Sequence, residues 1–286
     1  MDTAAGTDVG SVVRVDLQCL AVAMLPFTVA CCFVANTLSH RAQPAAGSGA
    51  GRKRVDVHAS DKGAAGGKIE GRESAAAVVM SLFKNRVWVT AALGYSAWSF
   101  TVGAFAVWSP TYLYSVLGVP LEVADVQFGA ITLGNGLVGT AVGGVLLDAL
   151  VRRLGTDVAS ASLIMVCGLT AAAVPCLLAA FLLQPKWAFY VGLVIGEFFL
   201  FSITSPVNGV FLWCVPPQQR SMSIAVMNIV IHLLGDVFSP AIAGALWSAT
   251  NDARVTMACV SAWLGWAVLM WGLSATFSLR LNSAPA

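Results

Sequence analysis

Two apolar stretches decide how this chain folds: VGLVIGEFFLFSITSPVNGVFLW (191–213) and SIAVMNIVIHLLGDVFSPAIAGALW (223–247). Each is long enough to cross a bilayer as a helix, which takes about 20 apolar residues. Each also carries ionisable side chains near its middle, Glu197 in the first and His232 with Asp236 in the second. Such groups cost at least about 2.5 kcal/mol at the bilayer centre, so they normally face a protein interior or a water-filled cavity and serve a function. The pattern predicts a transport protein.

The composition of the whole chain agrees with a membrane protein. Of its 286 residues, 58% are hydrophobic and only 10% are charged, whereas soluble proteins carry about 25% charged residues. We expect an all-α membrane protein with about seven transmembrane helices, because a helix satisfies its own backbone hydrogen bonds in lipid. The expected spans are Leu17–Asn36, Val87–Trp108, Phe128–Leu150, Val158–Leu183, Trp187–Trp213, Ser221–Trp247 and Val255–Leu279.

The expected order along the chain is one isolated helix, a linker and a six-helix unit. The parts are a short non-cytoplasmic tail (1–16), the isolated helix (17–36), a flexible cytoplasmic linker (37–86), the six-helix unit (87–279) and a cytoplasmic tail (280–286). The linker is rich in Ala, Gly and charge, and it has too few large apolar residues to fold. This orientation places all of the 16 Lys and Arg residues except Arg14, Lys186 and Arg254 on the cytoplasmic side, which satisfies the positive-inside rule.

Polarity divides the six later spans into two triplets. The third span of each triplet, Val158–Leu183 or Val255–Leu279, contains no charged side chain. We therefore expect these two spans to face lipid and the other four to line a cavity. Two triplets with matching roles form each half of a major facilitator transporter, as a 3+3 inverted repeat. The sequence predicts one such half.

Three segments carry a more specific resemblance. They are LGYSAWSFTVGAFAVWSPTYL (93–113), FGAITLGNGLVGTAVGGVLLDALVRR (128–153) and GEFFLFSITSPVNGVFLWCVPPQQRSMSIAVMNIVIHLLGDVFSPAIAGAL (196–246). Together they resemble the C-terminal half of a Spinster-type major facilitator transporter of plants or algae, with residues 17–36 as the family's sixth helix. The resemblance implies a multi-pass protein of the plasma membrane or an endolysosomal membrane that moves lysolipids, sphingolipids or similar amphiphiles, with or without coupled protons. It also implies membrane lipid as a partner, together with a missing N-terminal six-helix half or a second copy of the chain.

Helical spacing gathers the candidate substrate-binding or proton-binding residues into two stripes. The stripes are Glu197, Thr204 and Asn208 on one span, and Asn228, His232, Asp236 and Ser239 on the next. Side chains three, four or seven residues apart share one face of a helix. At about 1.5 Å per residue, Glu197 and Asp236 both lie about 15 Å deep, and we expect them on neighbouring helices. The alternative is a purely structural hydrogen-bond cluster.

Two further pairs are candidates for contacts to a substrate headgroup. Tyr95 and Ser99 are four residues apart on the span 87–108, and Thr132 and Asn135 are three residues apart on the span 128–150. Tyr and Ser are also common packing residues in membrane helices. Both readings, binding and packing, stay open at this point.

The span 128–150 and its end carry two more patterns. Gly136, Gly139 and Gly143 belong to a run of small residues that lets helices approach closely. GVLLDALVRR (144–153) resembles the cytoplasmic loop signature of the major facilitator superfamily, which implies a gating latch formed by Asp148, Arg152 and Arg153. The alternative is that both arginines are ordinary positive-inside anchors.

Several classes of function compete with lipid transport. A non-transporting truncated fragment, a seven-span receptor and a carrier of another small molecule all fit the number of spans. No nucleotide-binding glycine loop, metal-ligand cluster or nucleophile triad is evident, so we expect no enzyme, no cofactor, no bound metal and no nucleic-acid partner. The resemblance favours the transporter.

Overall fold

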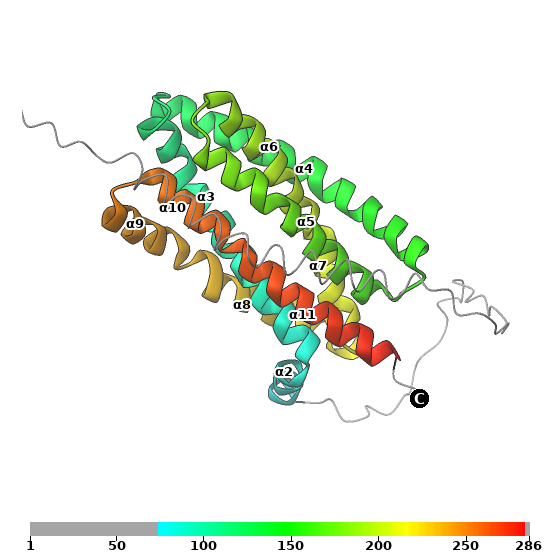
Figure 1. Cartoon of the computed structure of the whole chain (residues 1–286). Coiled ribbons are helices and arrows are strands. Elements are labelled where there is room, and N and C mark those ends of the chain that lie inside the picture. The colour runs from blue at the N-terminus through cyan, green and yellow to red at the C-terminus, as the bar shows by residue number, and fades with distance from the viewer. Residues whose placement is uncertain (1–73, 284–286) are drawn as a thin grey trace, which may run out of the picture.

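The structure is a computed structural model that describes residues 74–283. Its helices are α2 (Ala75–Lys84), α3 (Arg86–Ser115), α4 (Leu121–Leu154), α5 (Val158–Leu182), α6 (Lys186–Ser202), α7 (Thr204–Trp213), η1 (Pro217–Gln219), α8 (Arg220–Ile231), η2 (His232–Asp236), α9 (Ser239–Thr250), α10 (Ala253–Ala262) and α11 (Leu264–Ser283). They form one elongated bundle (Figure 1). The expected isolated helix, Leu17–Asn36, lies outside the described residues.

The six spans predicted over 87–279 are confirmed as an all-α membrane fold. Three of the expected spans are single helices, and the other three are interrupted: α6 and α7 form one, α8, η2 and α9 form the next, and α10 and α11 form the last. Within residues 74–283, five segments are long and apolar enough to cross a membrane, and α2 with α3 makes a sixth. The chain is therefore a multi-pass membrane protein.

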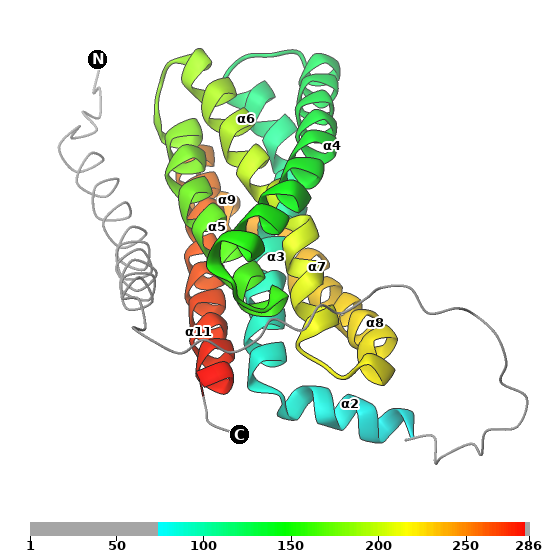
Figure 2. The same ribbon diagram turned by 90° about the vertical axis from the view of Figure 1, so that its right-hand side faces the viewer.

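The last part of the expected linker is helical, so its prediction as flexible through residue 86 is wrong. Helix α2 lies at 83° to α3 and crosses the end of the bundle (Figure 2). Asn85 forms the corner: its side-chain oxygen accepts from the backbone N–H groups of Val87 and Trp88, and its amide donates to the Cys214 carbonyl. Ala and apolar residues fill α2, but ten residues are too few to span a bilayer. The expected tail at 280–286 also begins inside a helix, because α11 continues to Ser283.

Within the described bundle, α5 and α10–α11 are more buried than α4 and α8–α9, and their expected contact with lipid stays a prediction. In the most apolar stretch of α5, 61% of the residues are buried, against 22% in α4. The two segments Pro217–Thr250 and Ala253–Leu281 show the same contrast. Absence of charge is typical both of a helix that faces lipid and of one that is buried in protein, because lipid tails and a helix interior are equally apolar. The exposed apolar surfaces therefore lie on α4 and on α8–α9.

Glycines of α4 make its close contact with α6. A Cβ atom at Gly139 would lie 3.1 Å from the Phe198 carbonyl oxygen, and one at Gly143 would overlap the Ser202 carbonyl. Gly136, on the same helix, faces open space. The close approach of α4 to α6 thus depends on two of the small residues, four positions apart.

The orientation of the bundle remains a prediction, and two exposed glutamines test it. Gln218 lies in the turn between α7 and α8, at the end expected to be cytoplasmic, and Gln184 lies between α5 and α6 at the other end. In inverted vesicles from a bacterial host, a membrane-impermeant maleimide should label Gln218→Cys in a cysteine-free background. Gln184→Cys should react only after detergent is added. The opposite pattern would contradict the orientation.

Candidate functional site

Glu197 lies in the interior of the bundle, with only 2% of its surface exposed. It projects from α6 about 15 Å from the helix start at Lys186, counting about 1.5 Å per residue. The Thr132 hydroxyl of α4 donates to both carboxylate oxygens, at 3.2 and 3.1 Å. Asn135, one turn further along α4, is also buried and adjoins the same carboxylate. The sequence pair Thr132 and Asn135 therefore meets Glu197, and no cation among the described residues forms a salt bridge with it.

A small cavity of about 40 Å³ adjoins Glu197 and Thr132. Its other walls are apolar side chains of α3, α4 and α6, among them Val102, Phe105 and Phe128. A space of this size with a carboxylate and a hydroxyl in its wall suits a water molecule, which needs polar partners. The arrangement provides a mid-membrane group that can accept a proton or a hydrogen bond.

A second polar contact between α4 and α6 escaped the sequence reasoning. The Tyr190 hydroxyl donates to the Gln127 side-chain oxygen at 2.7 Å. Tyr190 precedes Glu197 by two helical turns and Gln127 precedes Thr132 on α4, so both pairs join the same two helices. The seven-residue spacing from Tyr190 to Glu197 places both side chains on one face of a helix, and this pattern could have predicted the contact.

The stripe predicted from Glu197 to Asn208 is divided between two helices. α6 ends at Ser202, and α7 begins at Thr204. The Asn208 amide donates to the backbone carbonyl of Thr204 at 2.8 Å, within its own helix. Thr204 and Asn208 are half-buried and make no hydrogen bond to Glu197. Asn208 therefore supports α7.

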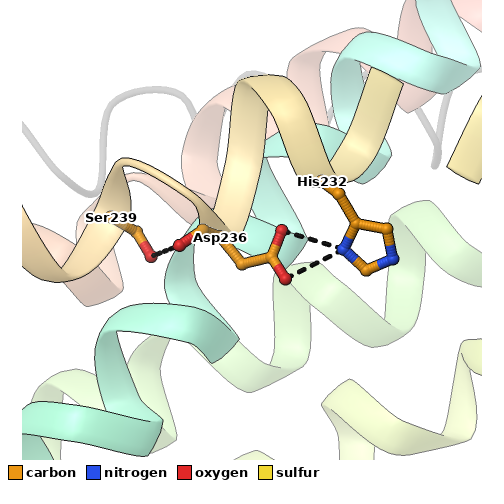
Figure 3. Close-up of polar contacts among 3 residues, drawn as sticks. All are labelled: His232, Asp236 and Ser239. Carbon is orange, nitrogen blue, oxygen red and sulfur yellow. Dashed lines mark hydrogen bonds and ion pairs between the residues drawn. The ribbon is translucent and has the colours of Figure 1, made fainter. Parts of the chain in front are cut away.

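The second stripe lies on an exposed face. His232 Nδ1 is 3.0 and 2.9 Å from the two carboxylate oxygens of Asp236, and the two side chains point toward each other along the helix (Figure 3). The His232 side chain is 62% exposed and that of Asp236 is 36% exposed. Asn228 is exposed as well, while Ser239 is buried and donates to the Asp236 carbonyl.

A π-helical turn, His232–Asp236, interrupts the span that carries the second stripe. The backbone N–H of Val237 donates to the His232 carbonyl, five residues earlier. Single π turns of this kind are frequent at functional sites. Gly235 permits the turn to pack against α3, because a Cβ atom there would lie 2.8 Å from the Ser96 carbonyl oxygen and the Ser99 Cβ.

Glu197 and Asp236 are on spans that contact each other through α7 and α8, as predicted, but α6 and η2, which carry the two residues, share no extended contact. Asp236 packs on Gly103 of α3, whereas Val102 and Phe105 of α3 wall the Glu197 cavity. The two carboxylates therefore lie at the same level of the bundle, on different sides of α3. They form two centres rather than one.

Tyr95 and Ser99, the candidates for headgroup contacts on α3, are both buried. Tyr95 is buried against Trp98 and Phe211, about 10 Å along α3 from Val102. Ser99 is buried beside Gly235. Neither meets Glu197.

The residues of the expected gating latch lie exposed at the end of α4. Asp148, Arg152 and Arg153 are all exposed, and no salt bridge joins them in the described part of the chain. α4 ends at Gly155, whose φ of 60° suits glycine. The gating role stays a prediction.

Comparison with known proteins places this arrangement in a family. The model of the Organic Anion Transporter Polypeptide (OATP) family matches residues 16–183 and 184–259. "Probable sphingolipid transporter spinster homolog 2" of Arabidopsis thaliana is 33% identical over 192 residues, which cover 67% of this chain and 38% of the relative. The chain belongs to the OATP family and is similar to Spinster-type transporters. The "Sphingosine-1-phosphate transporter SPNS2" of Danio rerio is 30% identical over 202 residues, covering 67% of this chain and 40% of that protein.

A solved structure shows the same fold for this OATP-family chain. A bacterial homologue of the human lysosomal transporter Spinster, in an inward-facing and unoccupied conformation, matches with a TM-score of 0.60 and 17% identity. The match covers 76% of this chain and 54% of the bacterial one. The predicted resemblance and the major facilitator fold are thus confirmed, and the protein is a transporter relative rather than an enzyme. The chain spans about two fifths of the length of the curated relatives it matches.

Proposed function

We propose that this chain forms the C-terminal half of a carrier for sphingolipids or similar amphiphiles. The observation that carries the proposal is Glu197: a carboxylate buried at mid-membrane depth, which accepts from the Thr132 hydroxyl and lies next to the uncharged Asn135. A charge in this setting is expensive, so it usually belongs to a transport or proton pathway. The names of the Arabidopsis and zebrafish relatives supply the substrate class.

The two centres have different proposed roles. Glu197, enclosed beside a small cavity, binds a proton or a water molecule. His232 and Asp236 lie on an exposed face, where Nε2 of the imidazole is free to meet a polar headgroup in a water-filled pathway. α3 separates the two, and it contacts both through adjacent residues, Val102 and Gly103. A shift of α3 would therefore change the packing at both centres.

The exposed faces of α4 and of α8 with η2 are the proposed contact with a six-helix N-terminal half. Leu133 and Leu137 of α4 and Ile229 and Leu233 of α8–η2 are more than half exposed. Facilitator carriers enclose their substrate between two such halves that rock against each other. A second copy of this chain is the other candidate for the partner.

Co-purification tests this contact. The tagged chain, co-expressed with the N-terminal half of the Arabidopsis relative, should retain that half on an affinity column. Leu137→Asn, at a position 69% exposed, should weaken retention several-fold, because an amide in an apolar helix contact loses packing and lacks a partner. The matched control is Leu273→Asn on α11, at a position that is also exposed. If both variants retain the N-terminal half equally well, α4 is not part of the contact.

A further inference from the structure

An apolar groove runs between α3, α9 and α10, and Glu197, His232 and Asp236 are not part of its lining. It has a volume of about 270 Å³. It is lined by Phe100, Ile242, Ala243, Leu246, Cys259, Val260 and Trp263, so its walls are almost entirely apolar.

Small and large side chains produce the groove. Its floor is formed by Ala243 and Val260, which are 1% and 3% exposed, and its rim by Ile242 and Trp263, which are 52% and 47% exposed. The Phe100 and Trp263 rings, with centroids 6.0 Å apart, make one wall. The groove is thus open at the surface of the bundle and closed beneath.

The groove lies within the hydrocarbon depth of the membrane. At about 1.5 Å per residue, Trp263 is about 15 Å from the start of α10 and Ile242 about 12 Å from the end of α9. Both segments are membrane spans. With almost entirely apolar walls the groove offers few partners to water, and an empty groove would lose dispersion contacts along its lining.

The groove is distinct from the Glu197 cavity. On α3, Phe100 faces the groove and Val102 faces the cavity. Residues two apart on a helix point in nearly opposite directions, at about 3.6 residues per turn. The groove therefore opens on the side of α3 turned away from Glu197, and its lining contains no charged side chain.

We propose that this groove is a binding site for one acyl chain of a bilayer phospholipid. The surrounding bilayer presents such chains at the depth of the groove, and the almost entirely apolar lining matches a hydrocarbon tail. Bound there, the chain would fill the space between α3, α9 and α10 and stabilise their packing.

Photo-crosslinking of the full chain in nanodiscs tests the site. The probe is a phosphatidylcholine with a diazirine in one acyl chain, and adducts are mapped by mass spectrometry of peptides. Adducts should concentrate on groove residues. Ala243→Leu, which fills the floor, should lower their yield several-fold. Ala241→Leu, the same change at an exposed position of α9 outside the groove lining, should leave it unchanged.

Two results would overturn the proposal. One is labelling spread evenly over the exposed apolar residues of the bundle and unchanged by Ala243→Leu, which would mean bulk lipid alone. The other is a photoactivatable sphingosine that labels the groove and displaces the phospholipid from it, which would make the groove a substrate site. If Ala243→Leu does not give a monodisperse protein, Ile242→Ala, which removes the rim, must lower the labelling instead.

Discussion

Glu197→Gln should reduce lipid transport by a complex of this chain with an N-terminal half by about tenfold or more, while the protein stays folded. The amide can still accept the hydrogen bond from Thr132, but it cannot take up a proton or hold a full negative charge. Loss of a hydrogen bond to a charged group costs about 1.5–3 kcal/mol. Because about 1.4 kcal/mol corresponds to a tenfold change in an equilibrium constant, we expect transport to fall by about tenfold or more. The measurement is initial flux into proteoliposomes, with the melting temperature recorded beside it.

Comparison variants separate a transport role from a structural one. Glu197→Ala removes both hydrogen bonds from Thr132 and should lower stability by about 1–3 kcal/mol, the cost of a buried polar group left without a partner. Asn208→Ala, which removes a bond within α7, should change flux little. If Glu197→Gln transports normally, the carboxylate serves only to join α4 and α6.

Gly143→Leu should prevent the bundle from assembling. Its side chain would overlap the Ser202 backbone carbonyl of α6, and the backbone, unlike a flexible side chain, has no room to move aside. Overpacking of a well-packed core costs about 1–3 kcal/mol, and occasionally more. With a backbone clash we expect about 3 kcal/mol or more, seen as loss of the monodisperse peak in size-exclusion chromatography.

The same substitution at Gly136 is the control for Gly143→Leu. Gly136 lies on the same helix, and nothing within 4 Å would meet its added Cβ atom. Gly136→Leu should therefore purify like the unmodified chain. Equal behaviour of the two variants would mean that α4 and α6 do not pack as closely as described.

The positions of the spans could be predicted from the sequence, because a helix in lipid needs a long apolar run. The expected span Val158–Leu183 is within one residue of α5. The breaks could not be predicted. The π turn at His232–Asp236 leaves the hydrophobic pattern intact, and the packing of its Gly235 on Ser96 and Ser99 involves another helix, which spacing along one helix does not reveal.

Individual residues of the candidate site could be predicted from the sequence, but not which of them lie together in space. Spacing along one helix placed Thr132 beside Asn135, and the structure adds that both meet Glu197. Spacing could not reveal that α3 stands between Glu197 and Asp236, since this depends on the order of helices in space. Nor could it show that Asn208 bonds within its own helix.

Flux of sphingosine-1-phosphate into proteoliposomes would show whether this chain completes a lipid carrier, because the charged headgroup keeps this lipid from crossing a bilayer unaided. This chain together with the N-terminal half of the Arabidopsis relative should move the lipid above the background of empty vesicles, and either part alone should not. The two halves of the Arabidopsis relative, reconstituted together, are the positive control. Background flux from the mixed complex, beside active control vesicles, would contradict the proposal that this chain completes a lipid carrier.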